Sequence, residues 1–320
     1  MIAALAVAAL VAGQTVPQYV RSADPDTKAC LYWKPRSITY HVNPARTATS
    51  TSCGPLSTTD SAAAKAVEAG FAAWTGAQEA CTDLALVRGA DTTSIKLGYD
   101  PKGANENLVV FRKGWCSQDP NAKNDPCMTD PSIRCGDTYN CFENTGNLGG
   151  TNIIALTTTT YAPSTGEIVD ADMEFIDWTG ASSGTALGTT RLQGWYFTCF
   201  APTGSDHACT TYGEAGCYYM DLQNTATHEA GHFIGFAHTS NSDLTMAATA
   251  SVGEVSKRSL AQGDVDGVCA VYPKAGATLT CVTAPKKKGG CGTGGEGVLA
   301  LLGGLALAKL RRRQRTTAAA

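Results

Sequence analysis

The stretch that decides the fold lies at residues 227–238, which read Thr227-His228-Glu229-Ala230-Gly231-His232-Phe233-Ile234-Gly235-Phe236-Ala237-His238. On a helix, His228 and His232 would lie on one face, one turn apart. Gly235 can adopt backbone conformations that other residues avoid, so the helix can end there and His238 can return as a third ligand. Three neutral imidazoles and one water form the open tetrahedral site of a catalytic zinc ion, and Glu229 could reach that water without binding the metal.

The full pattern H-E-x-x-H-x-x-G-x-x-H is far more specific than H-E-x-x-H, which is short enough to occur by chance. Three of the five histidines of the chain fall inside these residues. The alternative is a helix whose histidines are solvated or packed in a core, which the long motif disfavours. We interpret His41 as a surface or packing residue rather than a ligand, and we expect His207 to be exposed.

Composition bounds the class of protein. With 320 residues the chain can form one large domain or two small ones, and a charged fraction of 17% with a net charge of -3 indicates no nucleic-acid partner. The thirteen cysteines include no C-x-x-C pair, so a structural zinc ribbon is not indicated. Twelve of them precede Cys291, enough for six disulfides formed in an oxidising compartment, although their connectivity does not follow from the sequence.

The apolar start of the chain resembles a secretory signal. Residues 1–13 are small and apolar like the hydrophobic region of such a signal, with cleavage expected after Gly13, although the basic residues that usually precede this region are missing. The alternative is a buried N-terminal helix. Residues 14–36 then form an N-terminal segment without clear periodicity. We therefore expect the protein to be secreted.

The tail has an order of its own. A linker at 274–290 leads to a segment at 291–315, in which Cys291 and small residues precede an apolar run at 298–310 and a basic cluster at 311–315. The run is short for a spanning helix, and the arginines would stop transfer and stay cytoplasmic. This order resembles the C-terminal sorting signal of myxobacterial surface proteins, which implies a sorting protease and a membrane as partners. The alternatives are a plain membrane anchor or an amphipathic tail.

Between these ends, periodicity predicts an alternation of strands and helices. We expect helices at 60–75, 220–234 and 259–271, and strands at 37–43, 84–87, 94–99, 107–111, 151–158 and 168–177. Two loop-rich stretches, 115–150 and 180–217, carry seven of the cysteines and are interpreted as disulfide-pinned insertions.

The predicted strand 168–177 alternates between apolar and acidic residues. Asp170 and Asp172 lie on its acidic face, and their carboxylates could bind Ca²⁺, which prefers oxygen ligands. We favour the alternative, a solvated strand face, because carboxylates are mostly exposed.

At this point the chain resembles the metzincin superfamily of zinc endopeptidases, in particular its matrixin-like branch. Met246 follows His238 by eight residues and matches the Met-turn that runs beneath the metal in this superfamily. Thr239 and the lack of a tyrosine two residues after Met246 set astacins and serralysins aside. The resemblance spans a domain at 37–273, apart from the insertions, and is carried by residues 38–40, 67–74, 228–246 and 260–273.

The resemblance implies an α+β fold: a mixed, mostly parallel sheet with two long helices, then a small irregular C-terminal subdomain with a third helix. It implies Zn²⁺ held by His228, His232 and His238, with Glu229 as general base and with Gly235 and Met246 supporting the site. A protein or peptide substrate would lie along the edge strand near 151–156, and we expect a monomer.

One further similarity is weaker. Arg134-Cys135-Gly136-Asp137 is similar to the inhibitory cysteine motif of some zinc protease propeptides, but it lies between predicted strands among other cysteines. We therefore expect Cys135 to form a disulfide.

Two other functions compete with a secreted or surface-sorted zinc endopeptidase. The first is a catalytically silent zinc-fold module for surface binding or adhesion, against which the intact Glu229 argues. The second is a zinc-stabilised structural protein, which needs a fourth protein ligand, and no fourth ligand lies near the motif.

Overall fold

The computed structural model describes residues 19–45, 53, 62–78, 80–130, 132–143, 153–177, 186–187 and 195–274. The signal-like segment 1–13, residues 275–290 of the predicted linker and the segment 291–315 lie outside these residues. Within the described part of the chain, no helix is long and apolar enough to cross a membrane.

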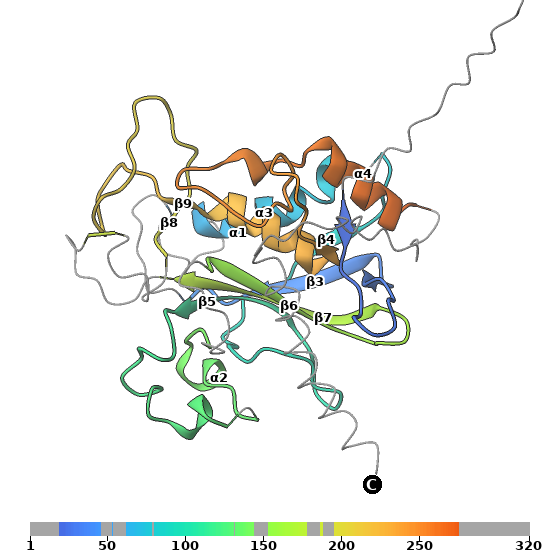
Figure 1. The fold of residues 1–320 in the computed structure, drawn as a ribbon, viewed down its shortest axis with the longest axis horizontal. Coiled ribbons are helices and arrows are strands. Elements are labelled where there is room, and N and C mark those ends of the chain that lie inside the picture. Colours follow the sequence, from blue (N-terminus) through green and yellow to red (C-terminus); the bar gives the residue numbers. More distant parts are fainter. Residues whose placement is uncertain are drawn as a thin grey trace, which may run out of the picture.

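A six-stranded sheet forms the centre of the fold (Figure 1). Its strands run in the order β2-β7-β5-β3-β4, all neighbours on this path being parallel, and β6 pairs antiparallel with β7. The strands are β2 (Tyr32–Trp33), β3 (Ser37–Val42), β4 (Ala85–Arg88), β5 (Asn107–Lys113), β6 (Ala155–Tyr161) and β7 (Glu167–Asp177). Two small sheets join β1 (Val20–Arg21) to β10 (Phe236–Ala237) and β8 (Phe197–Thr198) to β9 (Met220–Asp221).

The helices divide between the two faces of the sheet. Figure 1 shows α1 (Ala62–Ala72) and α3 (Leu222–Phe233) over one face, with α4 (Gln262–Val271) beyond them, and the short α2 (Gly136–Tyr139) beneath the other face. Three 3₁₀ turns, η1 (Gly76–Gln78), η2 (Pro126–Met128) and η3 (Ser256–Arg258), complete the elements. The predicted α+β fold with a mostly parallel sheet is confirmed.

The core forms where α1 and α3 meet the sheet. Val67, Phe71 and Trp74 form the apolar stripe of α1 and its C-terminal turn, and all three are fully buried. Phe71 stacks on Tyr40 of β3 with ring centroids 3.8 Å apart, and Trp74 donates through Nε1 to the Thr227 carbonyl of α3 at 2.8 Å. Burial of each of these side chains stabilises the folded state by about 1.5–3 kcal/mol. Their contacts with β3 and α3 fix the position of α3 relative to the sheet.

The predicted strand at 94–99 is wrong. The main chain there runs over the outer face of the sheet, the face opposite α1 and α3, and side chains satisfy its N–H groups. Leu97 N donates to Asp137 Oδ1 at 3.2 Å, and Gly98 N donates to Asp172 Oδ2 at 2.6 Å. The apolar and polar residues of this segment do alternate as in a strand, but its main-chain N–H groups bind side-chain carboxylates instead of the backbone of a neighbouring strand.

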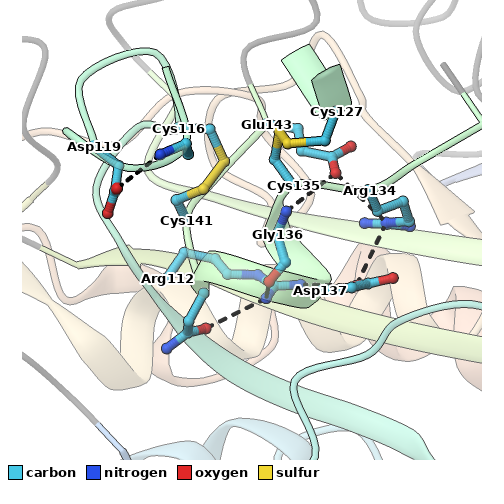
Figure 2. Close-up of a disulfide and its surroundings, with 12 residues drawn as sticks. Arg112, Cys116, Asp119, Cys127, Arg134, Cys135, Gly136, Asp137, Cys141 and Glu143 are labelled. Atoms are coloured by element: carbon cyan, nitrogen blue, oxygen red, sulfur yellow. Dashed lines mark hydrogen bonds and ion pairs between the residues drawn. A yellow bond between two sulfur atoms is a disulfide. The ribbon is translucent and has the colours of Figure 1, made fainter. Parts of the chain in front are cut away.

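Two disulfides pin the first insertion, Cys116–Cys141 and Cys127–Cys135 (Figure 2). The expectation that Cys135 is disulfide-bonded is therefore confirmed. The insertion docks on the sheet through the fully buried Arg112 of β5, which donates to the Gly136 carbonyl at 2.7 Å.

Two more disulfides join parts of the chain that are distant in sequence, Cys53–Cys199 and Cys81–Cys269, and a third, Cys209–Cys217, closes a short loop within the second insertion. Cys30 is also disulfide-bonded, while Cys281 and Cys291 lie outside the described residues. The Cys81–Cys269 bond joins the segment after η1 to α4, so a covalent link reinforces the packing of the C-terminal helix against the rest of the fold.

Candidate metal centre

The helix that carries the motif begins at a well-made N-cap. Asp221 Oδ1 accepts from Asn224 N at 2.7 Å, which satisfies one of the free N–H groups of the first turn of α3. Arg258 donates two hydrogen bonds of 2.9 and 2.5 Å to the same carboxylate. The start of α3 is therefore anchored to the segment that follows the motif.

The structure brings the three motif histidines together. His228 and His232 project from one face of α3, and Nε2 of each lies 3.1 Å from Nε2 of His238. His228 is nearly buried and the other two are half-buried. In the described part of the chain, no other group of three His, Cys, Asp or Glu side chains is placed to hold a metal ion.

The partners of the other ring nitrogens decide the tautomers. His228 Nδ1 lies 2.7 Å from the Thr245 carbonyl, and His232 Nδ1 lies 2.8 Å from the Phe236 carbonyl. A carbonyl oxygen only accepts, so both Nδ1 atoms carry the proton and both Nε2 atoms present lone pairs. Burial lowers the pKa of all three histidines, that of His238 to about 3. The neighbouring imidazoles lower the pKa of His228 and His238 further.

These atoms fit zinc. Neutral imidazoles whose Nε2 lone pairs converge repel one another unless a cation lies between them. Two nitrogens bound to one tetrahedral zinc at about 2.0–2.1 Å are separated by roughly 3.4 Å, close to the spacing seen here. The backbone carbonyls that hold Nδ1 also set the ring orientation, as such partners do around metal ligands.

Gly235 allows the third histidine to return. It follows α3 with φ of 93°, and its N–H donates to the His232 carbonyl at 2.9 Å. A Cβ at this position would lie 2.6 Å from the Leu31 carbonyl oxygen. Only glycine combines this conformation with so close a backbone approach, so the chain can reverse through β10 toward His238.

Met246 lies under α3, the helix that carries His228 and His232. The residue is 2% exposed, and a Cβ added to Gly231 would come within 2.2 Å of its sulfur and 2.6 Å of the Trp74 ring. Gly231 stands between the two helical histidines in the sequence, so its missing side chain lets the methionine approach the helix directly. Thr239 N donates to the Met246 carbonyl at 3.0 Å, which ties the third histidine's segment to the same turn.

Asp264 on α4 holds this turn from behind. It is 1% exposed, and its Oδ2 accepts from Thr245 N at 2.9 Å and from Ala261 N at 3.1 Å. Thr245 in turn provides the carbonyl for His228. The C-terminal subdomain is therefore linked to a metal-ligand candidate through one carboxylate.

Glu229 is buried next to the histidines, 5% exposed, and meets a residue of the edge strand. Thr157 Oγ1 donates to Glu229 Oε2 at 2.7 Å and lies 3.1 Å from the Glu229 carbonyl oxygen. Burial raises the pKa of Glu229 to about 7, against the lowering effect of these hydrogen bonds. A cation bound by the histidines would lower this pKa through its charge.

The acidic face of β7 is not the solvated face that we favoured from its sequence. Asp170 and Asp172 are each 1% exposed, because the first insertion and residues 94–98 cover them. Both Asp172 oxygens accept main-chain N–H groups, from Gly98 at 2.6 Å and Leu108 at 2.9 Å. The expectation of Ca²⁺ at Asp170 and Asp172 gains no support in the described part of the chain.

The two remaining histidines lie away from the cluster. His41 is partly buried, and its Nδ1 contacts the Ala90 carbonyl at 2.8 Å. His207 lies 2.6 Å from Glu214 with an exposed side chain. Neither belongs to the metal-binding group, in keeping with their sequence interpretation as packing and exposed residues.

Sequence reasoning did not single out Thr157, Gly231 or Asp264 as site residues. Gly231 lies inside the motif at a position written as x, and Asp264 was visible only as a residue of the resembling C-terminal stretch. Thr157 lies in a run of four threonines with no motif of its own. A contact between an edge strand and a helix 72 residues later leaves no local signal.

A mostly parallel sheet beside two helices, with a third helix after the histidine motif, is a metzincin-like fold. Residues 156–273 match the family model Matrixin, which supports a matrixin-like metzincin and a zinc metallopeptidase. The matched part contains the histidine cluster, Glu229, Thr157 and Met246. No match to the chain was found among curated proteins.

Proposed function

We propose that this protein is a zinc-dependent endopeptidase that hydrolyses peptide bonds in protein or peptide substrates. The observation that carries the proposal is the convergence of three imidazole nitrogens beside the buried carboxyl of Glu229, with Nε2 of His228 and of His232 each 3.1 Å from Nε2 of His238. Zinc held by His228, His232 and His238 would lower the pKa of a bound water and polarise the scissile carbonyl.

The chain's own residues perform the proton transfers. Glu229 takes a proton from the attacking water and returns it to the leaving amine, a role for which a carboxyl with a pKa near neutrality is suited. Thr157 holds one oxygen of that carboxyl. Met246 and Gly235 keep the three imidazoles in place from below and behind.

The test is Glu229→Gln. This change keeps the size and hydrogen-bonding capacity of the side chain but removes its basicity, so zinc content should stay near one per chain while cleavage of a peptide library falls by about 10³-fold or more. Near-normal cleavage by this variant would contradict the assignment. If the unchanged, zinc-loaded protein binds peptides without cleaving them, the silent binding or adhesion module is the correct function.

We further propose that the protein acts outside the cytoplasm, secreted or at a cell surface. The disulfides among the described cysteines support an oxidising compartment. The signal-like residues 1–13 and the sorting-like residues 291–315 are the sequence grounds. Intact-mass measurement of the protein from culture supernatant and from washed cells tests both, because each predicted processing step removes a defined mass.

A further inference from the structure

One residue, Thr157, joins the edge strand of the sheet to the candidate general base. We propose that Thr157 is a positioning residue whose hydroxyl orients the Glu229 carboxylate while its main chain pairs with an extended peptide substrate. This inference rests on the proposed peptidase function and adds to it a direct coupling between substrate docking and the orientation of the base.

The side-chain half of the proposal rests on two short contacts. Thr157 Oγ1 lies 2.7 Å from Glu229 Oε2 and 3.1 Å from the Glu229 carbonyl oxygen. A hydroxyl that donates to a carboxylate forms a charge-assisted hydrogen bond, about twice as strong as a neutral one. Within the described part of the chain Oε1 makes no hydrogen bond, so the contact leaves that oxygen for the proton of the attacking water.

The main-chain half follows from the register of β6. In the described residues β6 pairs with β7 alone, which leaves its other edge open. Ile176 N donates to the Ile154 carbonyl at 3.0 Å, so these two opposite residues form a hydrogen-bonded pair. Hydrogen-bonded and non-hydrogen-bonded pairs alternate along antiparallel strands, so every second pair of β6 and β7 counted from this one is also hydrogen-bonded. Thr157 lies opposite Met173 in a pair of the other kind. Its N–H and C=O therefore point to the open edge, where an added strand would bind.

These two halves occur together because of strand geometry. Side-chain direction and hydrogen-bond direction both alternate with a period of two along a strand. A residue of β6 that offers its main chain to the open edge therefore turns its side chain to the α3 face. Thr157 meets Glu229 in this way, whereas Thr158 turns toward Asp172 on the outer face. A peptide that pairs with β6 fixes the backbone of Thr157 and with it the hydroxyl that holds the base.

Three variants test the proposal on zinc-loaded protein. Thr157→Val removes the hydroxyl but keeps the branched shape, Thr157→Ser keeps the hydroxyl, and Thr158→Val is the matched control on the opposite face of the strand. The substrate is a quenched fluorescent peptide selected from library cleavage by the unchanged protein. Thr157→Val should lower kcat by roughly 10- to 100-fold, the value of a hydrogen bond to a charged group, with KM and zinc content nearly unchanged. Thr157→Ser should restore kcat.

A second readout needs no activity. In metal-free protein, Thr157→Val should lower the thermal unfolding midpoint when Glu229 is present. In a Glu229→Ala background the same substitution should lower the midpoint by less than half as much, because the hydrogen bond between the two side chains is already absent there. If the valine variant does not fold, Thr157→Ala takes its place.

The outcomes separate the two proposals. Full kcat in Thr157→Val, no recovery in Thr157→Ser, an equal loss in Thr158→Val, or additive shifts of the unfolding midpoints would each overturn the role of Thr157. Absence of cleavage by the unchanged, zinc-loaded protein overturns the proposed peptidase function, and the role of Thr157 with it.

Discussion

Two buried groups of polar side chains lie on opposite faces of the sheet. The histidine cluster, on the helix face, consists of His228, His232 and His238. The acidic cluster, on the outer face under the first insertion, consists of Asp170, Asp172 and Glu174 of β7 together with Arg112 and Arg134. Both clusters remove chargeable groups from water, but they are satisfied in different ways.

The acidic cluster finds most of its partners inside the protein. Arg112 Nε donates to Glu174 Oε1 at 2.6 Å, and Asp172 accepts two main-chain N–H groups. Asp170 Oδ2 has no hydrogen-bond partner among the described residues, but burial raises the pKa of Asp170 to about 6 and that of Asp172 well above its usual range. Burial therefore favours the neutral, protonated form of these two carboxyls, which lowers the cost of leaving one carboxyl oxygen without a partner.

The histidine cluster has no such internal compensation. The Nδ1 atoms of His228 and His232 are held by backbone carbonyls, and their Nε2 atoms each lie 3.1 Å from Nε2 of His238. Burial alone therefore does not mark a functional site. A buried cluster with internal partners holds the fold together, whereas one whose donor atoms converge without a partner requires a ligand from outside.

The strongest way to break this contrast is to remove a metal ligand. His238→Ala should eliminate bound zinc and lower peptide cleavage by at least about 10³-fold. His207→Ala, at an exposed histidine, is the control and should change neither. Zinc titration with calorimetry should raise the unfolding free energy of the unchanged protein by about 2.7 kcal/mol at a hundred times the dissociation constant. No such rise would mean that the cluster does not bind zinc.

The acidic cluster should respond in stability rather than in zinc content. Arg112→Met removes the hydrogen-bonded partner of the buried Glu174, leaves only the longer contact with Arg134, and should cost about 3–5 kcal/mol in unfolding free energy. The neighbouring exposed Lys113→Met should stay within roughly 0.5 kcal/mol of the unchanged protein. Denaturant unfolding measures both changes. An equally small effect of Arg112→Met would show that the cluster does not hold the insertion to the sheet.

Two disulfides of equal sequence separation, one in each insertion, allow the two insertions to be compared directly. Cys127–Cys135 lies beside the acidic cluster and Cys209–Cys217 lies in the second insertion, each with a sequence separation of 8. Replacing either pair by serine should cost roughly 2–3 kcal/mol of stability, since the closed loops are equal in length.

The same two replacements should differ in cleavage specificity. Tyr218, next to Cys217, packs on Gly253, where an added Cβ would lie 2.4 Å from its ring. Gly253 directly follows residues 247–252, the segment that the resemblance implies would line the pocket for the substrate side chain after the scissile bond. Loss of Cys209–Cys217 should therefore alter the pattern of peptide-library cleavage, whereas loss of Cys127–Cys135 should leave it unchanged. The contrast fails if both replacements alter the pattern equally.

The smallest expected effect concerns pH. The folded-state pKa of Asp170 is raised above its unfolded value, so the native state binds more protons and stability falls as pH rises from about 4 to 6. Asp170→Asn removes this loss and should gain roughly 2 kcal/mol at pH 7 relative to pH 4. The exposed Asp243→Asn serves as control. Unfolding curves across this pH range would contradict the raised pKa of Asp170 if both variants behave alike.

Much of the site could be predicted because it is encoded within a few turns of chain. The spacing of His228 and His232, the conformational freedom of Gly235 and the offset of His238 are local properties, and the structure places these residues as the motif predicts. Strands β3, β5 and β7 were also predicted close to their observed bounds, because their hydrophobic patterns carry the period of a strand.

The errors arose where the partner is distant in sequence. The acidic face of β7 was expected to be solvated, because no residue near Asp170 or Asp172 in the sequence indicates that an insertion covers this face. The segment 94–99 alternates like a strand, but it meets carboxylates rather than a strand edge. Local periodicity indicates the conformation that a segment prefers, but it does not indicate which distant segment will pack against it.

By itself, the sequence determined the chemistry of this protein: its donor atoms, their spacing on one helix, and the carboxyl of Glu229 beside them. Only the tertiary structure decided which second side chain orients that carboxyl, which face of the sheet is buried, and how the turn at Met246 is held. The physical reason is range. Helical spacing follows from covalent geometry within a few residues, whereas the contact from Thr157 to Glu229 spans 72 residues and exists only once β6 has packed against α3.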